Sequence, residues 1–173
     1  MSPESTPQNP GSLWRGDFSL TLRIMSRLDQ IRLIRAALAG VMSHLEIADS
    51  DIYSLGLAVT EIINNSMEHG YKGDEDKEIE VRLHIGDSEV QVDIIDSAPP
   101  FPEEERYRLT NNLKSLEDPS EEWTMRGHGL QIVRRIVDSI MLDTKEDYNC
   151  MRLRKIVGMQ NAKAEGERPL MRQ

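Results

Sequence analysis

The spacing of hydrophobic residues changes several times along the chain, and each change predicts a different element. In the segment 17–22, DFSLTL, apolar and polar residues alternate, which predicts a half-buried strand. From Met25 to Met42 the apolar residues recur every three or four positions, which predicts a long first helix. The chain is therefore expected to begin with a strand followed by a helix.

A second helix is expected directly after the sequence ADSD at 48–51. Asp and Ser residues cap helix N-termini, so this sequence is expected to supply the cap. An apolar stripe then runs from Ile52 to Ile63 at helical spacing. Gly70 is expected to end the helix as its C-cap.

The remainder of the pattern predicts a sheet and one more helix. The segments 79–85 and 90–94 alternate strictly around a short turn, which predicts an antiparallel hairpin with one apolar face. Helical spacing returns over 127–140, and a final strand is expected around Met151 and Leu153. The order of elements predicts an α+β fold: a two-layer sandwich in which helices cover one face of a mostly antiparallel sheet.

Three segments of low periodicity divide the chain. Residues 1–12 and 159–173 contain little to bury and are expected to be loose, disordered tails around one domain over 13–158. Residues 102–126 are rich in charge and long for a loop in a compact domain. Loops of that length are usually lids or disordered, so a lid is expected there.

Composition narrows the class of protein. The chain has 173 residues, 38% hydrophobic and 29% charged, with a formal net charge of -9, which argues against direct binding of nucleic acid. Cys150 is the one cysteine, so an internal disulfide is excluded. No run of eighteen apolar residues and no signal peptide are present in the sequence, so we expect a cytoplasmic protein that does not enter a membrane.

Polar residues interrupt the second helix at regular intervals. Glu61, Asn65 and His69 are four residues apart in VTEIINNSMEHGYK, and they form a polar stripe beside the apolar one. Taken alone, this stripe is typical of a solvated helix face with an i,i+4 pair. A carboxylate and an amide one turn apart also match a phosphate site, where the amide oxygen binds Mg²⁺ and the carboxylate acts as a base.

Two further motifs lie downstream. DSAPPF follows a predicted strand, and the carboxylate of Asp96 there is able to bind an exocyclic amine; taken alone, the motif is an ordinary turn. RGHGL precedes the third helix, and its two glycines let backbone N–H groups approach an anion, with Arg126 adjacent. A lone GxG is weak evidence, because glycines before helices are common.

The order and spacing of the three motifs are more specific than any one of them. A helix with ExxxNxxxHGY, a hairpin ending in Asp-x-small-x-Pro-Phe, a loop, and GxGL opening a helix resemble the Bergerat-type ATP-binding fold. That superfamily includes histidine kinases, gyrase-like ATPases and Hsp90-like chaperones. Within it, the chain most resembles the bacterial anti-sigma-factor serine kinases, over about residues 17–156.

The resemblance implies roles for individual residues. It implies that Glu61 is the base acting on the incoming hydroxyl and that Asn65 binds Mg²⁺. It further implies that Asp96 binds the adenine amine, that Ala98 lies against the base, and that His69 packs or hydrogen-bonds at the end of the helix. The phosphate-side backbone contacts that it implies are those of Gly127, His128, Gly129 and Leu130, and the adjacent Arg126 is a further candidate for a phosphate contact.

Two positions depart from the family pattern. Ala98 stands where the family usually has Gly, and alanine adopts φ > 0 only with strain, so reduced nucleotide affinity is expected if the turn needs that conformation. The glycine before the GxG is also replaced, by Arg126 or Met125.

The function implied by the resemblance is that of a protein-serine kinase. Such a protein binds Mg-ATP, phosphorylates a Ser of a STAS-type anti-sigma-factor antagonist, and sequesters a sigma factor when it is not so engaged; a homodimer is also implied. Two alternatives remain open from the residues. One is a nucleotide-gated binding module without phosphotransfer, and the other is an α+β interaction domain that binds no nucleotide.

Overall fold

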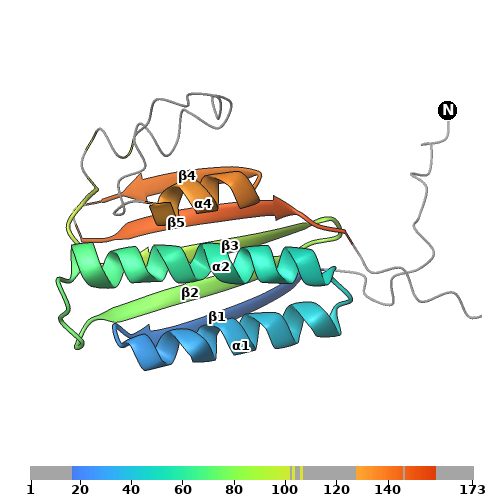
Figure 1. Ribbon diagram of the computed structural model, residues 1–173, viewed down its shortest axis with the longest axis horizontal. Coiled ribbons are helices and arrows are strands. Elements are labelled where there is room, and N and C mark those ends of the chain that lie inside the picture. The colour runs from blue at the N-terminus through green and yellow to red at the C-terminus, as the bar shows by residue number, and fades with distance from the viewer. Residues whose placement is uncertain (1–16, 102, 104–105, 107–127, 146, 159–173) are drawn as a thin grey trace, which may run out of the picture.

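The computed structural model describes residues 17–101, 103, 106, 128–145 and 147–158. The described part of the chain is an α+β domain, as the hydrophobic pattern predicted (Figure 1). Its elements in chain order are β1 Phe18–Met25, α1 Leu28–His44, α2 Asp49–Asn65, the π-helical turn η1 Ser66–Gly70, β2 Glu78–Ile85, β3 Glu89–Asp96, α4 His128–Ile136, β4 Ser139–Thr144 and β5 Asn149–Ile156.

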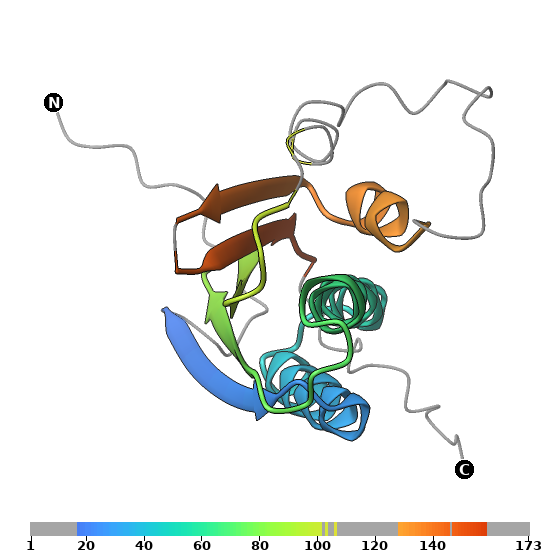
Figure 2. The ribbon, with the colours of Figure 1, turned by 90° about the vertical axis from the view of Figure 1, so that its left-hand side faces the viewer.

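The five strands form one sheet in the order β1-β2-β3-β5-β4, and every neighbouring pair is antiparallel. The predicted hairpin is confirmed as β2 and β3, with Gly86 N–H donating to the Glu89 carbonyl in the turn. Seen along the sheet, α1, α2 and α4 all lie against the same face (Figure 2). This two-layer arrangement places the helix that carries Glu61 and Asn65 directly on the sheet.

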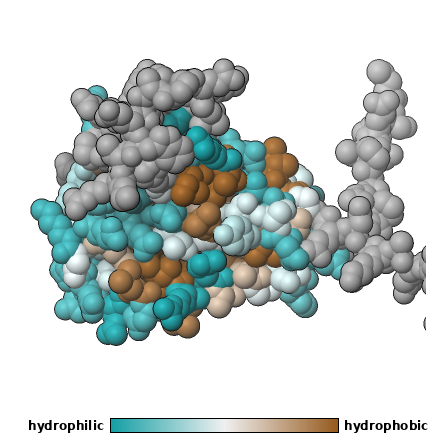
Figure 3. All heavy atoms as spheres, in the orientation of Figure 1, coloured by the Kyte–Doolittle hydropathy of each residue, from teal (hydrophilic) through white to brown (hydrophobic). Residues whose placement is uncertain are grey.

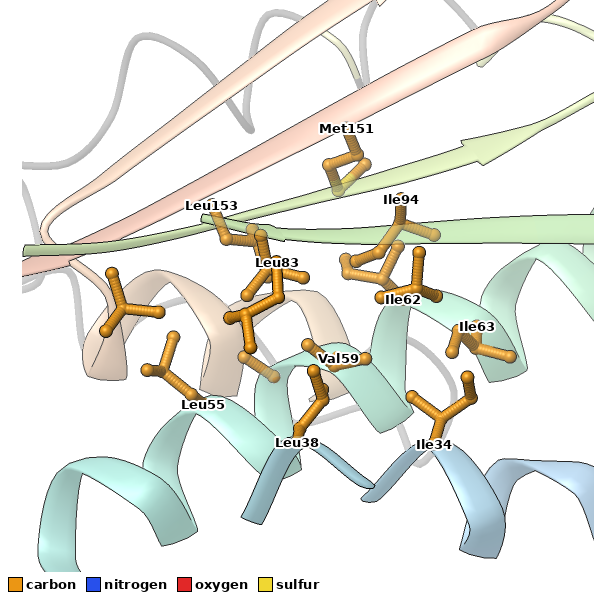
Figure 4. Packing of buried hydrophobic residues seen from close by; sticks show 14 of the residues in the cluster. Ile34, Leu38, Leu55, Val59, Ile62, Ile63, Leu83, Ile94, Met151 and Leu153 are labelled. Carbon is orange, nitrogen blue, oxygen red and sulfur yellow. The ribbon is translucent and has the colours of Figure 1, made fainter. Parts of the chain in front are cut away.

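The core lies between the helices and the sheet (Figure 4). Aliphatic side chains of α1 and α2 meet those of β2, β3 and β5, and alternate strand residues supply the sheet side. Among the largest fully buried side chains are Ile34, Leu38, Leu55, Ile62, Ile63, Leu83, Ile94 and Leu153. Burial of this apolar surface at roughly 25 cal/mol per Å² is what holds the two layers together.

The other face of the sheet carries several ion pairs between neighbouring strands. Glu80 accepts from Arg23 Nε at 2.7 Å and from Arg82 Nε at 2.5 Å. Arg152 donates twice to the Asp93 carboxylate, each time at 2.8 Å. Charged pairs across neighbouring strands stabilise a sheet without hydrophobic cover, so this face needs no helices.

Several predicted helix boundaries were wrong by a few residues. Met25 belongs to the end of β1, where it pairs with Glu78, so α1 begins only at Leu28. The predicted ADSD cap is also wrong: Ala48 is the N-cap residue and makes no side-chain cap hydrogen bond. Asp49 and Asp51 lie in the first turn of α2, where their charge favours the positive end of the helix dipole.

The third predicted helix was too long. It ends at Ile136, and the segment from Ser139 forms the edge strand β4. Ile140 satisfies both a helical and an alternating pattern, so spacing alone did not separate the two elements. The chain turns at Asp138, whose backbone N–H donates to the Arg154 carbonyl of β5.

The surface over the helices is mixed in polarity (Figure 3). Leu28, Leu33 and Tyr53 are exposed on α1 and α2 among polar neighbours. No helix in the described part of the chain is long and apolar enough to cross a membrane. The predicted tails 1–12 and 159–173, and nearly all of the predicted lid 102–126, lie outside the described residues.

Candidate functional site

The polar stripe of α2 lies at the flank of the core. Glu61 and Asn65 are half-buried, while Ile62 and Ile63 beside them are fully buried against the sheet. The two polar side chains therefore stand beside the packed face of the helix, as their spacing predicted.

His69 does not follow the stripe. Residues after Asn65 form the π-helical turn η1, which has more residues per turn than an α-helix and so rotates later side chains out of phase. His69 is exposed and so does not pack in the core, whereas the hydrogen bond expected as its alternative role at the end of the helix stays a prediction. Ser66 and Met67 face inward in its place.

A buried hydrogen-bond network surrounds Asp96. The residue ends β3 and is only 6% exposed. Its Oδ2 accepts from Ser66 Oγ at 2.5 Å, and its Oδ1 accepts from Ala98 N and from Asn149 Nδ2, both at 3.0 Å. Three donors on one carboxylate hold it in a single orientation, as a buried polar group requires.

The turn after Asp96 is held by Tyr71. The Tyr71 hydroxyl accepts from the backbone N–H of Ser97 at 2.8 Å and donates to the Glu78 carbonyl at 3.2 Å. Within the described residues, the non-glycine residues with positive φ are Glu46 and Lys72. Ala98 thus fits this turn without the strain that a left-handed conformation would bring.

Gly70 gives Ala98 its space. A Cβ built on Gly70 would overlap Ala98 Cβ. The helical segment ends at Gly70 as expected, but its C-cap residue is Tyr71, and among the described glycines it is Gly73 that has positive φ, so the C-cap role expected for Gly70 is wrong. Its role is steric: the end of η1 passes close to the turn that follows β3.

Gly129, in the first turn of α4, lies against Glu61. A Cβ at position 129 would overlap Glu61 Oε2 and come within 3.2 Å of its carboxyl carbon. The structure thus brings together one residue of the RGHGL motif and the predicted base. The lack of a side chain at 129 is what allows α4 to approach α2 so closely.

Other residues of that motif are only partly described. Arg126 and Gly127 lie outside the described residues, and His128 is the first residue of α4. Leu130 is half-buried and packs on the hydrophobic core. Among the described members of the motif, Gly129 is therefore the one next to Glu61, while Leu130 anchors the helix.

Asn65 carries an amide oxygen, a type of ligand that Mg²⁺ takes in proteins. Its Nδ2 is buried and has no hydrogen-bond partner in the described structure, and because an amide nitrogen is a donor, it is the oxygen that would bind a metal. Mg²⁺ keeps several waters and takes only one or two protein ligands beside substrate phosphates. No group of three or more His, Cys, Asp or Glu side chains suited to a metal occurs among the described residues. A single amide ligand fits magnesium bound together with a nucleotide, and does not fit a metal held by protein alone.

Two residues of this site were missed in the sequence. Ser66 follows Asn65 directly and lies four residues after the buried Ile62, on the same face of the helix, where it was not distinguished from an ordinary helix residue. Asn149 pairs directly with Asp96 across the sheet. Assigning the pairing of the last strand with β3 would have revealed it.

The sequence of the chain matches a known domain family. The family described as "histidine kinase-like ATPase domain" matches residues 24–155. The chain belongs to this family. The match spans the elements from the end of β1 to β5, and so contains Glu61, Asn65 and Asp96.

Relatives within the family carry more specific names. A serine-protein kinase RsbW of Listeria innocua is 31% identical over 123 residues, which are 71% of this chain and 78% of the relative. An RsbW of Oceanobacillus iheyensis is 23% identical over 73% of this chain and 79% of its own length. An anti-sigma F factor of Clostridium botulinum is 23% identical over 74% of this chain and 86% of its own length.

Solved structures agree on the fold. The RsbU and RsbW domains of a Mycobacterium tuberculosis protein superpose with a TM-score of 0.57 at 18% identity, covering 80% of this chain and 32% of that one. The SiaB–SiaC complex of Pseudomonas aeruginosa gives a TM-score of 0.59 at 14% identity, covering 78% of this chain and 88% of that one. The resemblance to anti-sigma-factor serine kinases is thereby confirmed at the level of family and fold.

Proposed function

We propose that this protein is an ATP-dependent protein-serine kinase that also acts as an anti-sigma factor. In this proposal it binds Mg-ATP, transfers the γ-phosphoryl group to a Ser of a STAS-type antagonist, and sequesters a sigma factor when the antagonist is phosphorylated. Relatives named serine-protein kinase RsbW and anti-sigma F factor support the class of activity.

One observation carries the proposal. The hydrogen bond from Ser66 to Asp96 joins the residue directly after Asn65 to the carboxylate expected to bind the base. The residue proposed to bind the metal and the carboxylate proposed to bind the base are thereby linked through Ser66, which supports the proposal that both contact one nucleotide. Phosphoryl transfer depends mainly on such positioning and on charge stabilisation.

The residues of the chain divide the chemistry between them. Bound magnesium would neutralise charge on the phosphates, and Asn65 would hold it. Glu61 accepts the proton of the substrate Ser hydroxyl as the Ser oxygen forms a bond to the γ-phosphorus. The bond between the γ-phosphorus and the β–γ bridging oxygen breaks, and ADP is released. Gly129 lies beside Glu61, where α4 closes one side of the site.

Phosphorylation of the antagonist tests the kinase activity. The antagonist is identified first, by cross-linked co-purification from the source cells, and is then incubated as a pure protein with the kinase and Mg-ATP. Mass spectrometry should find one phosphoserine, and Glu61→Gln should lower its rate of formation about 10²- to 10⁴-fold, the usual contribution of a general base. Glu68→Gln, an exposed carboxylate in η1, is the matched control and should change nothing.

Two results would contradict the proposal in different ways. Absence of phosphoserine together with tight Mg-ATP binding would favour the nucleotide-gated binding module. Failure of a fluorescent ATP analogue to bind at millimolar concentration would leave the plain interaction domain.

The partners and the assembly are part of the same proposal. Sigma factors carry basic DNA-binding faces, and a chain with a net charge of -9 is suited to attract them. The association rate should then fall as salt rises. A homodimer is also expected, and light scattering on the purified protein measures it directly.

A further inference from the structure

Asn149 lies next to Asp96 but has no part in the proposed phosphotransfer. Asp96 is the last residue of β3 and Asn149 the first of β5, and the two are directly paired. Side chains of directly opposed residues share one face of a sheet. Here that face is the one covered by the helices, where Ser66 reaches Asp96.

The orientation of the Asn149 amide follows from its neighbours. Asn149 Nδ2 donates to Asp96 Oδ1 at 3.0 Å and to the Ala98 carbonyl at 2.8 Å. Both neighbours are acceptors, so the amide must present its NH₂ group to them, because the opposite orientation would place three oxygens together. Both N–H donors of the side chain are therefore used.

The other end of the amide has no partner. Asn149 is 2% exposed, and its Oδ1 is buried without a hydrogen bond in the described structure. A buried acceptor left unpaired is costly and rare in folded proteins. An oxygen fixed in this state beside a ligand-binding carboxylate points to a contact made with the ligand.

The chemistry of the two side chains selects the ligand. Asp96 and the free end of Asn149 present only acceptors, which suit an exocyclic amine with two N–H donors. A carbonyl oxygen at the same place, as in hypoxanthine or guanine, would be repelled by both. We propose that Asn149 determines specificity for a 6-aminopurine nucleotide: its NH₂ group orients Asp96, and its Oδ1 accepts a hydrogen bond from the amine.

This inference rests on the proposed nucleotide binding, and the two are tested separately. Dissociation constants are measured by calorimetry for Mg-ATP and for purine riboside triphosphate, which lacks the amine, with the wild-type chain, Asn149→Leu and Gln91→Leu. Gln91 is the matched control, because its amide also donates to a carboxylate, Asp93, at 3.1 Å.

The expected result is a loss of binding affinity that is largely confined to ATP, the nucleotide that carries the amine. Asn149→Leu should weaken ATP binding about tenfold or more and purine riboside triphosphate binding less than about threefold, because only ATP has the amine that Asn149 Oδ1 contacts. The preference for ATP, defined as the dissociation constant of purine riboside triphosphate divided by that of ATP, should therefore fall. Gln91→Leu should leave both unchanged. If Asn149→Leu does not fold, Asn149→Thr, which keeps a donor for Asp96, is measured in the same way. It should also lower the preference for ATP over purine riboside triphosphate.

Other results overturn the inference. An equal loss for both nucleotides would show that Asn149 has only a structural role, and an unchanged ratio would show that its oxygen does not meet the amine. A wild-type chain that binds neither nucleotide would overturn the proposed function itself, and this inference with it.

Discussion

Gly70 and Ala98 share a space that holds only one Cβ. Gly70 ends the π turn after α2, and Ala98 lies in the turn after β3, where the resembling family usually has Gly. Ala98 is buried and does not have positive φ. Its methyl group occupies the space that a Cβ on Gly70 would need. The departure at 98 is thus accommodated by the glycine at 70.

Substitution of Gly70 should therefore be destabilising. Gly70→Ala brings two Cβ atoms into overlap, and we expect it to lower the free energy of unfolding by about 1–3 kcal/mol, as overpacking typically does. Urea denaturation measures the change. Gly40→Ala in α1, whose Cβ would meet nothing within 4 Å, is the control and should stabilise the helix by up to about 1 kcal/mol.

A double variant separates this overlap from a general effect of the backbone. Gly70→Ala combined with Ala98→Gly should recover most of the lost stability, because one Cβ then occupies the shared space. If the double variant is as unstable as the sum of the single ones, the two residues do not compete for the same space.

Gly129→Ala should impair phosphotransfer. The added Cβ would overlap Glu61 Oε2, so either the carboxylate or α4 must move. A displacement of about 1 Å in a catalytic group can cost about 10²-fold in rate, and we expect at least a tenfold loss. Antagonist phosphorylation at saturating Mg-ATP measures it. Gly56→Ala on α2 is the control, since its Cβ would meet only Arg35 Nε at an ordinary 3.8 Å; a full rate in Gly129→Ala would contradict the close approach.

Ser66→Ala should weaken nucleotide binding. The change removes the 2.5 Å hydrogen bond to Asp96 Oδ2 and leaves that carboxylate held only at Oδ1, by Ala98 N and Asn149 Nδ2. Hydrogen bonds to charged groups contribute about 1.5–3 kcal/mol, so the dissociation constant for ATP should rise about tenfold or more. Thr60→Val is the control, because the Thr60 hydroxyl donates only to the Gly56 carbonyl within α2. Equal affinities of the two variants would disprove the positioning role of Ser66.

Glu80 should make the stability depend on acid pH. The hydrogen bond from Arg23, and secondarily that from Arg82, lowers the pKa of Glu80 below its ordinary value of 4.5, against the opposing effect of burial. The unfolded chain therefore binds this proton at a higher pH than the native protein does. The stabilisation is fully present above about pH 4.5 and is lost as pH falls through the lower native pKa.

Glu80→Gln measures this contribution. At pH 7 it should lower the free energy of unfolding by about 1 kcal/mol or less, because both arginines are largely exposed to solvent. The difference from wild type should shrink below pH 4. Glu78→Gln is the matched control, since its carboxylate lies 3.8 Å from Arg23 and is mostly exposed; a constant difference across pH would contradict the assignment.

The sequence was sufficient for those features that depend on periodicity. Strict alternation identified the β2–β3 hairpin, and helical spacing identified the buried stripe of α2 with Glu61 and Asn65 beside it. The antiparallel sheet with helices on one face followed from the order of these elements.

Features that depend on exact backbone conformation were not predictable. The π turn η1 shifts the residues after Ser66 out of the α-helical phase and leaves His69 exposed, and no hydrophobic period signals it. The boundary between α4 and β4 falls where Ile140 satisfies two patterns. Asn149 becomes meaningful only through its pairing with Asp96, which depends on strand order and register.

The position of the π turn has a consequence for the two ends of a bound nucleotide. Asn65, proposed for the metal, and Ser66, which holds Asp96, are consecutive residues, so their Cα atoms are about 3.8 Å apart. A backbone shift at this one peptide unit would therefore displace the proposed metal ligand and the residue that holds Asp96 at the same time.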